Sequence, residues 1–464
     1  MVSRRSANCC LVDRFASEVM HFLRTNLARN SLWMILGQGL RLVIQALYFI
    51  EIAKSLGVRN YGAFVGVVAL VGIVYPFGTL GSGNLLVKNV ARDHSLFPVY
   101  WGRALAFTLT FGFLLIFLVL ALSQFVLPTE IPLMLVAMVA VSDVIGLNLI
   151  TQASQAFQAF ERLKWTATIN VLMSAGRLAG AVILIAIHPH PSALQWGYIY
   201  FGCTTAVTVV SLTLVRALIG SAKFAWKYIQ SELREGFYFS AGQTSQTIYN
   251  DIDKTMLSRL DTLAAAGIYG AAYRLIDVSF VPVSAALWSA YPSFFRAGAR
   301  GISSSLAYAK PLMRRALVYS GSVFVLLLAA AGLVPVILGS EYAATAAALR
   351  WLAILPVLKA LHYFFSDTLT SSGYQGVRTG IQAGVALLNV LLNLWVIPAY
   401  SWKGAAWSSI ACDATLLGGV SLAVWFLSRT KSDAPAASRE RESTRTNSSQ
   451  PFETNFSDSS ALVE

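Results

Sequence analysis

Residues 36–78 read LGQGLRLVIQALYFIEIAKSLGVRNYGAFVGVVALVGIVYPFG, and this stretch decides the fold. It contains two apolar runs separated by the short polar sequence SLGVRN. Each run approaches the ~20 residues that an α-helix needs to cross a hydrocarbon core of ~30 Å at ~1.5 Å per residue. The stretch therefore predicts a helical hairpin that spans a membrane twice.

Similar apolar runs recur along all 464 residues, of which 56% are hydrophobic and only 12% charged. A soluble chain carries about 25% charged residues, so the composition indicates a polytopic membrane protein. We predict an all-α fold of about twelve transmembrane helices. The predicted spans are residues 32–52, 61–82, 104–123, 131–155, 168–187, 194–219, 236–257, 263–292, 316–338, 344–371, 376–397 and 404–428.

The spans divide into two groups of six. We predict an N-terminal segment (1–31), a first lobe (32–219), a linker (220–235), a second lobe (236–428) and a disordered tail (429–464), which is rich in Ser, Thr, Arg and Glu. The gaps between spans are too short for a folded extramembrane domain. Two six-helix lobes would enclose a central cavity.

The basic residues predict the orientation. Eighteen Lys and Arg residues lie in the N-terminal segment and the even-numbered gaps, against four in the odd-numbered gaps. Cytoplasmic loops of membrane proteins are enriched in Lys and Arg, so both ends should be cytoplasmic. The net charge of +13 is then an insertion signal rather than a nucleic-acid-binding surface.

The second half repeats the landmarks of the first. Residues 241–283 read AGQTSQTIYNDIDKTMLSRLDTLAAAGIYGAAYRLIDVSFVPV, in which a Gly-Gln pair, a Tyr-Gly pair and a proline recur at offsets of 205 to 208 positions. Six predicted spans separate the copies, so both copies begin on the same side of the membrane. This is the pattern of a parallel repeat, with the two lobes related by an axis along the membrane normal.

Several charged residues fall near mid-membrane, where exposure to lipid is costly, so they should face the interior of the bundle. Arg41 and Arg177 belong to the first lobe, and Arg274 and Lys359 to the second. We predict that these four cations line a cavity shared by the lobes. Arginine binds phosphate oxygens through two parallel hydrogen bonds, so the cavity would suit a ligand that carries pyrophosphate.

The acidic residues leave two interpretations open. Asp251 and Lys254, like Arg274 and Asp277, stand three positions apart on one helix and could neutralise each other. The first interpretation assigns gating or coupling to the acidic and basic residues near the cavity, and the second treats them as structural pairs. The candidate gate or coupling residues are Asp143, Asp251, Asp253, Lys254 and Asp277, while Asp143 and Asp413 are also candidate cross-helix partners of the cations.

No motif indicates an enzyme, a cofactor or a metal site. The sequence has no GxxxxGK[ST], HExxH or GxSxG, and its four cysteines have no metal-ligand spacing. His188 and His190 flank a proline in a predicted external turn and are interpreted as exposed loop residues. We expect no catalytic residue and no bound cofactor.

Two runs resemble the signatures of Wzx-type polysaccharide biosynthesis flippases, in the multidrug/oligosaccharidyl-lipid/polysaccharide exporter superfamily. They are IAKSLGVRNYGAFVGVVALVGIVYPFGTLG and DKTMLSRLDTLAAAGIYGAAYRLIDVSFVPVSAALWSAYPSFFR. In the second run, Asp253, Tyr269, Tyr273 and Arg274 occupy the family's motif positions. The resemblance covers about residues 30–430 and specifies the branch of the superfamily better than the cargo.

The resemblance implies alternating-access transport of an undecaprenyl-pyrophosphate-linked oligosaccharide across the bacterial inner membrane, for O antigen, capsule or exopolysaccharide. The implied partners are that lipid-linked substrate and membrane lipids, with a polysaccharide polymerase and a chain-length regulator as candidates and no nucleic acid. Asp253 is then either part of a gate or a polar bracket between the seventh and eighth spans. The alternatives for the whole chain are a cation-coupled multidrug or metabolite antiporter, a peptidoglycan lipid II flippase, and a polytopic polymerase or acyltransferase.

Overall fold

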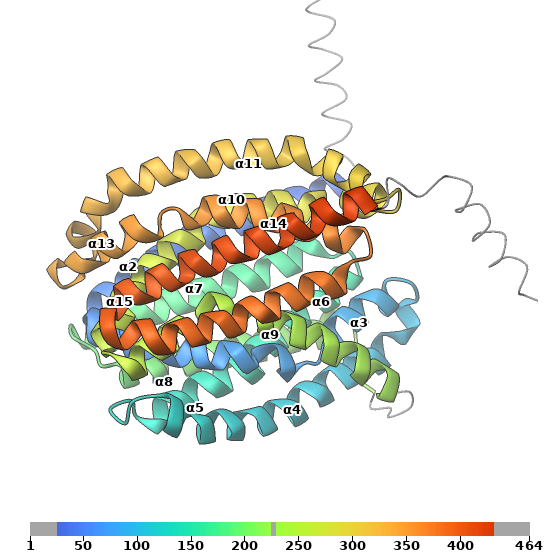
Figure 1. Cartoon of the computed structure of the whole chain (residues 1–464). Helices are drawn as coiled ribbons and strands as arrows, with labels where there is room; N and C mark the ends of the chain where they lie inside the picture. Colours follow the sequence, from blue (N-terminus) through green and yellow to red (C-terminus); the bar gives the residue numbers. More distant parts are fainter. Residues whose placement is uncertain (1–25, 224–228, 431–464) are drawn as a thin grey trace, which may run out of the picture.

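The computed structural model describes residues 26–223 and 229–430, and within these ranges every regular element is a helix. The helices lie side by side along one common direction (Figure 1). The first lobe comprises α2 (Asn26–Val74), η1 (Tyr75–Gly78), α3 (Ser82–Val90), η2 (His94–Leu96), α4 (Phe97–Val126), α5 (Leu133–Ala140), η3 (Val141–Leu147), α6 (Asn148–Ala159), α7 (Leu163–Ile187) and α8 (Ala193–Leu218).

The second lobe repeats this arrangement of long antiparallel helices. It comprises α9 (Ile229–Leu260), α10 (Leu263–Gly298), α11 (Ile302–Ala330), η4 (Ala331–Leu333), α12 (Val334–Leu338), η5 (Ser340–Tyr342), α13 (Ala343–Leu352), α14 (Leu355–Ser371) and α15 (Gln375–Thr430).

Two of these helices are hairpins. The backbone of α2 leaves the helical conformation at Gly57 (φ 69°), and that of α15 does so at Ser401 (φ 59°). The rings of Tyr48 and Phe64, on either side of Gly57, both pack against Trp196, so the two arms of α2 lie next to each other. A positive φ costs glycine little, which explains why so tight a turn forms at Gly57.

Eight helices in the described ranges are long and apolar enough to cross a membrane, and a ninth span arises if α13 and α14, bent by 42°, are taken together. The hairpins α2 and α15 each supply two spans. The helix α9 lies within the bundle beside them, although it is too polar to be recognised by hydropathy alone. The predicted all-α, twelve-span fold in two lobes is therefore confirmed.

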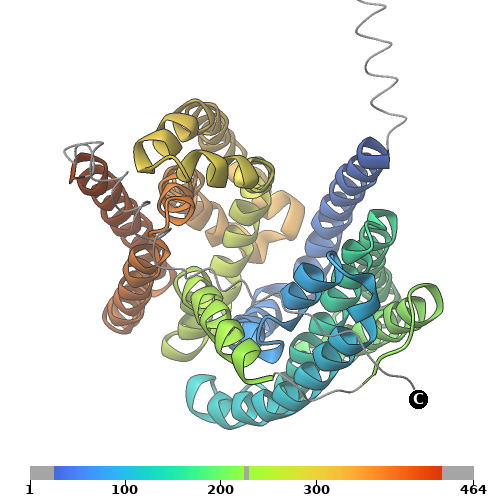
Figure 2. The same cartoon turned by 90° about the vertical axis from the view of Figure 1, so that its right-hand side faces the viewer.

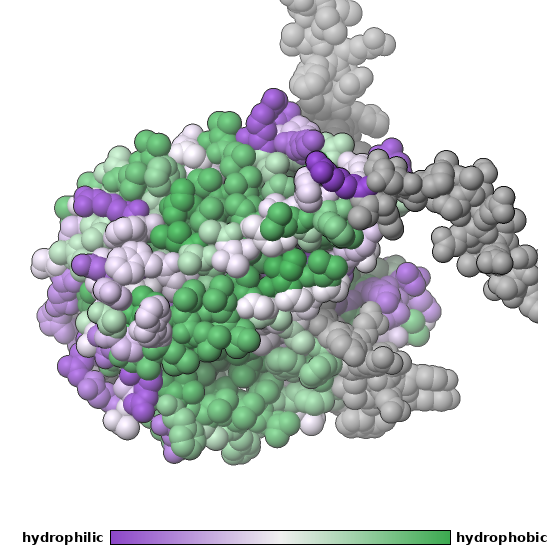
Figure 3. Space-filling model, viewed as in Figure 1, coloured by the Kyte–Doolittle hydropathy of each residue, from purple (hydrophilic) through white to green (hydrophobic). Residues whose placement is uncertain are grey.

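The surface of the bundle matches a lipid environment. A broad apolar belt crosses the face formed by α11 and α15, with polar residues gathered toward the two ends (Figure 3). Phe117, Val336 and Trp395 are each at least 70% exposed. Large apolar side chains are this exposed over so wide an area mainly where lipid replaces water.

The two ends of the bundle differ in how closely the lobes approach. We call the end that contains the Gly57 turn the Gly57 end, and the end where α2 begins and α15 finishes the tail end. Viewed from the tail end, the helices of the two lobes diverge, and α9 runs between them (Figure 2). Only α9 bridges the lobes toward the tail end in this view, where a Cβ atom on Gly236 would lie 1.8 Å from the carbonyl oxygen of Leu80 and Ser240 donates a hydrogen bond to the carbonyl of Pro76 (2.8 Å).

Glycines also allow the lobes to approach closely at the Gly57 end. A Cβ atom on Gly62 would lie 1.7 Å from the carbonyl oxygen of Leu263, and one on Gly267 would lie 2.1 Å from that of Val58. Across the same boundary, Tyr342 donates a hydrogen bond to the carbonyl of Ala53 (2.8 Å). We call this backbone contact between α2 and α10 the glycine seam. Small residues let membrane helices pack with their backbones in contact.

Several helix ends depart from the predicted boundaries; α11, for example, begins at Ile302, well before the predicted span 316–338. The predicted linker 220–235 is helical from Ile229, so the seventh span begins earlier than expected. The loop predicted after residue 52 is absent, because α2 stays helical up to the single break at Gly57. The predicted N-terminal segment and tail lie almost wholly outside the described residues.

Candidate functional site

Two adjoining cavities lie where the lobes meet. The arginine cavity, of about 310 Å³, is nearer the tail end and is lined by Arg41, Gln45, Asn170 and neighbouring residues. The aromatic cavity, of about 280 Å³, is nearer the Gly57 end. Tyr48, Arg177 and Arg274 line both, so the two cavities are continuous.

Three of the four predicted cations converge on the arginine cavity. Arg41 reaches it from α2, Arg177 from α7 and Arg274 from α10. No acidic residue of the described chain lines this cavity. Neither Arg41 nor Arg274 forms an ion pair with a described residue. The cavity thus presents two guanidinium groups whose charge no carboxylate neutralises directly.

Arg177 differs because it has a partner in its own lobe. Its Nη2 atom lies 3.4 Å from Oδ1 of Asp143, and its guanidinium lies 4.0 Å from the ring centre of Tyr200. Tyr200 also donates a hydrogen bond of 2.7 Å to Asp143. The cross-helix partner considered for the cations therefore exists for Arg177, and Asp143 is a structural counter-charge in this arrangement.

Asp143 reaches Arg177 from an unusual helix. The segment η3 is a π-helix inside the span formed by α5 and α6. One wider turn shifts the helix faces relative to a regular α-helix, and such turns are frequent at functional sites. No local sequence pattern indicates this π-helix, so the helix face on which Asp143 lies could not be predicted.

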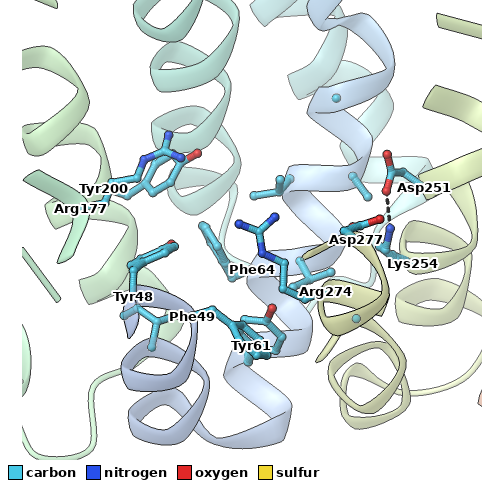
Figure 4. Close-up of a pocket in the computed structure, with 16 residues that line it drawn as sticks. Tyr48, Phe49, Tyr61, Phe64, Arg177, Tyr200, Asp251, Lys254, Arg274 and Asp277 are labelled. Carbon is cyan, nitrogen blue, oxygen red and sulfur yellow. Dashed lines mark hydrogen bonds and ion pairs between the residues drawn. The ribbon is translucent and has the colours of Figure 1, made fainter. Parts of the chain in front are cut away.

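The aromatic cavity receives its charged residues from the second lobe. Asp251, Lys254, Arg274 and Asp277 line it opposite Tyr48 and Tyr200 of the first lobe (Figure 4). Lys254 forms the predicted ion pair with Asp251. The other predicted pair, between Arg274 and Asp277, is not formed, because the Arg274 guanidinium extends into the cavity beside Phe64.

Asp253 and Lys359 lie outside both cavities. Asp253 is fully buried and accepts hydrogen bonds from Tyr269 and from Ser409, the latter at 2.9 Å. These contacts join α9, α10 and α15, as expected of the polar bracket. Lys359 donates to Asn250 (3.1 Å) and to the hydroxyl of Tyr273 (3.0 Å).

The placement of Lys359 corrects the prediction of a four-cation cavity. Its side chain is only 5% exposed and is held between α9 and α10 by polar groups that satisfy two of its donors. The hydropathy pattern predicts how deep Lys359 lies in the membrane but not the direction of its side chain around α14. Asp413, the second candidate partner of the cations, instead faces His362 at 3.4 Å.

The polysaccharide biosynthesis protein family matches residues 27–297, which is more than half of the chain. The chain belongs to this family. No curated protein matches it by sequence.

Solved structures show which fold this family member shares. An inward-facing multidrug resistance MATE transporter of the MOP superfamily aligns with a TM-score of 0.68 at 14% identity, over 86% of this chain and 99% of that one. Its outward-facing counterpart gives 0.60 at 13% identity, over 88% and 98%. The lipid II flippase MurJ in an inward closed conformation gives 0.64 at 12% identity, over 86% and 87%. At these identities the likeness concerns the fold.

Sequence reasoning missed the aromatic residues of this polysaccharide biosynthesis family member. Tyr48, Tyr61, Phe64 and Tyr200 all line the aromatic cavity, yet each sits in an apolar run where a ring is ordinary. The spacing along the helix could have indicated a common face, because Tyr61, Phe64 and Val68 are three and four positions apart and lie on one face of α2. That periodicity identifies a face but not what the face contacts.

Proposed function

We propose that this protein is a flippase. It carries a polyprenyl-pyrophosphate-linked oligosaccharide across the bacterial inner membrane for the synthesis of O antigen, capsule or exopolysaccharide. Membership of the polysaccharide biosynthesis family and a fold shared with MOP transporters support this proposal. The protein acts without catalysis, since translocation makes and breaks no covalent bond in the cargo.

The arginine cavity is the observation that carries the proposal. Arg41, Arg177 and Arg274 face one space, with no acidic residue of the described chain in its lining. A buried space with two unneutralised guanidinium groups stabilises a multivalent anion. Pyrophosphate is such an anion. Each planar guanidinium group can donate two parallel hydrogen bonds to its phosphate oxygens.

The two ends of the bundle support an alternating-access mechanism. The lobes are in backbone contact at the glycine seam, while toward the tail end their helices diverge except for α9, which stays in contact with the first lobe. The fold aligns better with the inward-facing transporter than with the outward-facing one. The excess of Lys and Arg at the tail end supports a cytoplasmic location for that end and for both termini, so the cargo would enter there.

The expected partners follow from this role. The lipid-linked oligosaccharide is the substrate, and a polysaccharide polymerase and a chain-length regulator would receive it on the far side. A lipid II flippase remains the second candidate because MurJ shares the fold. The family match favours surface polysaccharide as the product.

Deleting the gene tests the function. The lipid-linked repeat unit should accumulate on the cytoplasmic side of the membrane and the surface polymer should disappear. The intact chain supplied from a plasmid should restore the polymer. Normal polymer after deletion, in a genome without a second flippase, would contradict the proposal. Arrested peptidoglycan synthesis together with normal polymer would favour the lipid II role.

The orientation has its own test. Alkaline phosphatase is active only outside the cytoplasm, so a fusion after Leu218 should be inactive and a fusion after His190, in the predicted external turn, should be active. Activity in the opposite pattern would reverse the proposed topology.

A further inference from the structure

The aromatic cavity combines rings with carboxylates. The rings of Tyr48, Tyr61, Phe64 and Tyr200 form one part of its wall, and Asp251 and Asp277 lie across from them (Figure 4). This lining differs from that of the arginine cavity, which has no acidic residue among those described. One continuous space thus has a cationic part toward the tail end and an aromatic, acid-bearing part toward the Gly57 end.

The polar groups of the aromatic cavity differ in how far they are already engaged. Asp251 is paired with Lys254, whereas Asp277 forms no ion pair with a described residue. The hydroxyls of Tyr48 and Tyr61 form no hydrogen bond with a described residue. An ionised carboxylate has only acceptor sites, so Asp277 needs donors from a bound ligand or from water.

A sugar ring matches these groups. Its C–H faces are apolar and pack against aromatic rings, and its hydroxyls donate hydrogen bonds to carboxylates. A volume of about 280 Å³ is near the lower limit of ~300 Å³ for ligand pockets, so it suits one or two sugar units rather than a long glycan. The cavity also adjoins the space where the pyrophosphate would bind.

A sugar carboxylate does not match them. An ionised uronic acid would stand beside Asp277 and Asp251, and two like charges brought together in a space with little water repel strongly. The cations that line the same cavity are engaged elsewhere: Lys254 pairs with Asp251, Arg177 pairs with Asp143, and Arg274 is taken here to bind the pyrophosphate. The acidic residues therefore work against acidic sugars as much as they favour hydroxyl groups.

We propose that the aromatic cavity binds the sugar attached to the pyrophosphate and selects an uncharged sugar over a uronic acid, with Asp277 as the selecting residue. This inference rests on the proposed function, because it takes the pyrophosphate to lie in the arginine cavity. It adds a specificity that the cationic lining alone would not give, since arginines alone would favour acidic sugars.

Binding to the full-length protein in lipid nanodiscs tests the inference. Three probes share one short polyprenyl chain: the bare polyprenyl pyrophosphate, the same lipid with one N-acetylhexosamine, and the same lipid with one hexuronic acid. At pH 7 the N-acetylhexosamine probe should bind at least about tenfold more tightly than the hexuronic acid probe. Asp277→Asn should reduce this ratio toward one without changing the affinity for the bare pyrophosphate.

Two further variants act as controls. Asp413→Asn removes a buried carboxylate of the same lobe that lines neither cavity, so it should leave the ratio unchanged. Arg274→Gln should weaken all three probes in parallel. If Asp277→Asn yields no folded protein, Asp277→Glu, which keeps the charge, should retain the discrimination.

The outcomes separate the inference from the function. If the bare lipid binds in an Arg274-dependent manner but both sugars bind equally, or the uronic acid binds better, the selection by Asp277 is wrong and the flippase proposal stands. If none of the three probes binds the wild-type protein, the proposed function itself fails.

Discussion

The hairpins that open the two lobes share a scaffold and differ in charge. The segment from α2 to η1 and the pair α9–α10 each carry a Gly-Gln pair, a Tyr-Gly pair and a proline in the same order, and they meet at the glycine seam. Yet Arg41 is the one charged residue that α2 contributes to the two cavities, whereas α9 and α10 contribute Asp251, Lys254, Arg274 and Asp277. The repeat conserves the backbone architecture, and the site arises where the two copies differ.

We expect the largest loss of polymer export from a substitution in the glycine seam, which both hairpins share. Gly267→Ala adds a Cβ that would lie 2.1 Å from the backbone oxygen of Val58, so the seam must separate. Because backbone cannot move aside as a flexible side chain does, we expect polymer export to fall by at least about tenfold. Export should be measured together with the amount of protein in the membrane.

Gly321→Ala is the matched control, because its added Cβ meets no atom within 4 Å. It should export normally. Equal export by both variants would show that the seam is not a required contact of the transport cycle.

Much of the fold could be predicted, because the sequence shows where each charged residue lies within an apolar run and how far apart the repeated landmarks are. The span positions follow from the apolar runs, the repeat from landmarks at a nearly constant offset, and the convergence of Arg41, Arg177 and Arg274 from the cost of placing charge in lipid. Lys359 shows the limit of that reasoning, since the direction of its side chain around α14 depends on tertiary packing. Asp143 shows a second limit, because its reach to Arg177 depends on a π-helix that no local pattern announces.

The next largest effect is expected on stability, when the ion pair between Asp143 and Arg177 in the first lobe is broken. Asp143→Ala leaves the Arg177 guanidinium buried without its carboxylate, which should lower the free energy of unfolding by about 3–5 kcal/mol. The membrane abundance and the thermal midpoint in detergent should both fall. The double variant Asp143→Ala/Arg177→Met should recover most of the loss, because neither charge remains. A double variant as unstable as the single one would contradict the pairing.

The unpaired cations should respond differently. Arg41→Lys and Arg274→Lys keep the charge but lose the two parallel hydrogen bonds to phosphate, so export should fall by about 10-fold while abundance stays near wild type. Arg177→Lys provides the comparison, since its guanidinium also serves Asp143 and should affect abundance as well. If all three variants export fully, or if export falls only in proportion to abundance, these arginines stabilise the protein and do not bind the substrate.

We expect the smallest effect on stability and export from breaking an exposed ion pair. Arg59 and Glu130 lie 2.7 Å apart at the Gly57 end with side chains 71% and 59% exposed. Surface ion pairs contribute about 0–1 kcal/mol, so Arg59→Ala should leave both thermal midpoint and export near wild type. A large loss would mean that this pair, and not only the glycine seam, holds the Gly57 end closed.

The polarity of α9 has a consequence for how the protein is made. Helices partition into the bilayer during synthesis largely according to their own hydrophobicity, and α9 is too polar to qualify, whereas α10, two residues further on, does. The seventh span should therefore enter the membrane together with α10 as a hairpin, with Ser240, Thr244 and Thr255 hydrogen-bonded to the first lobe that is already in place. A chain truncated at Asp261 would leave α9 on the side of the membrane where it was synthesised.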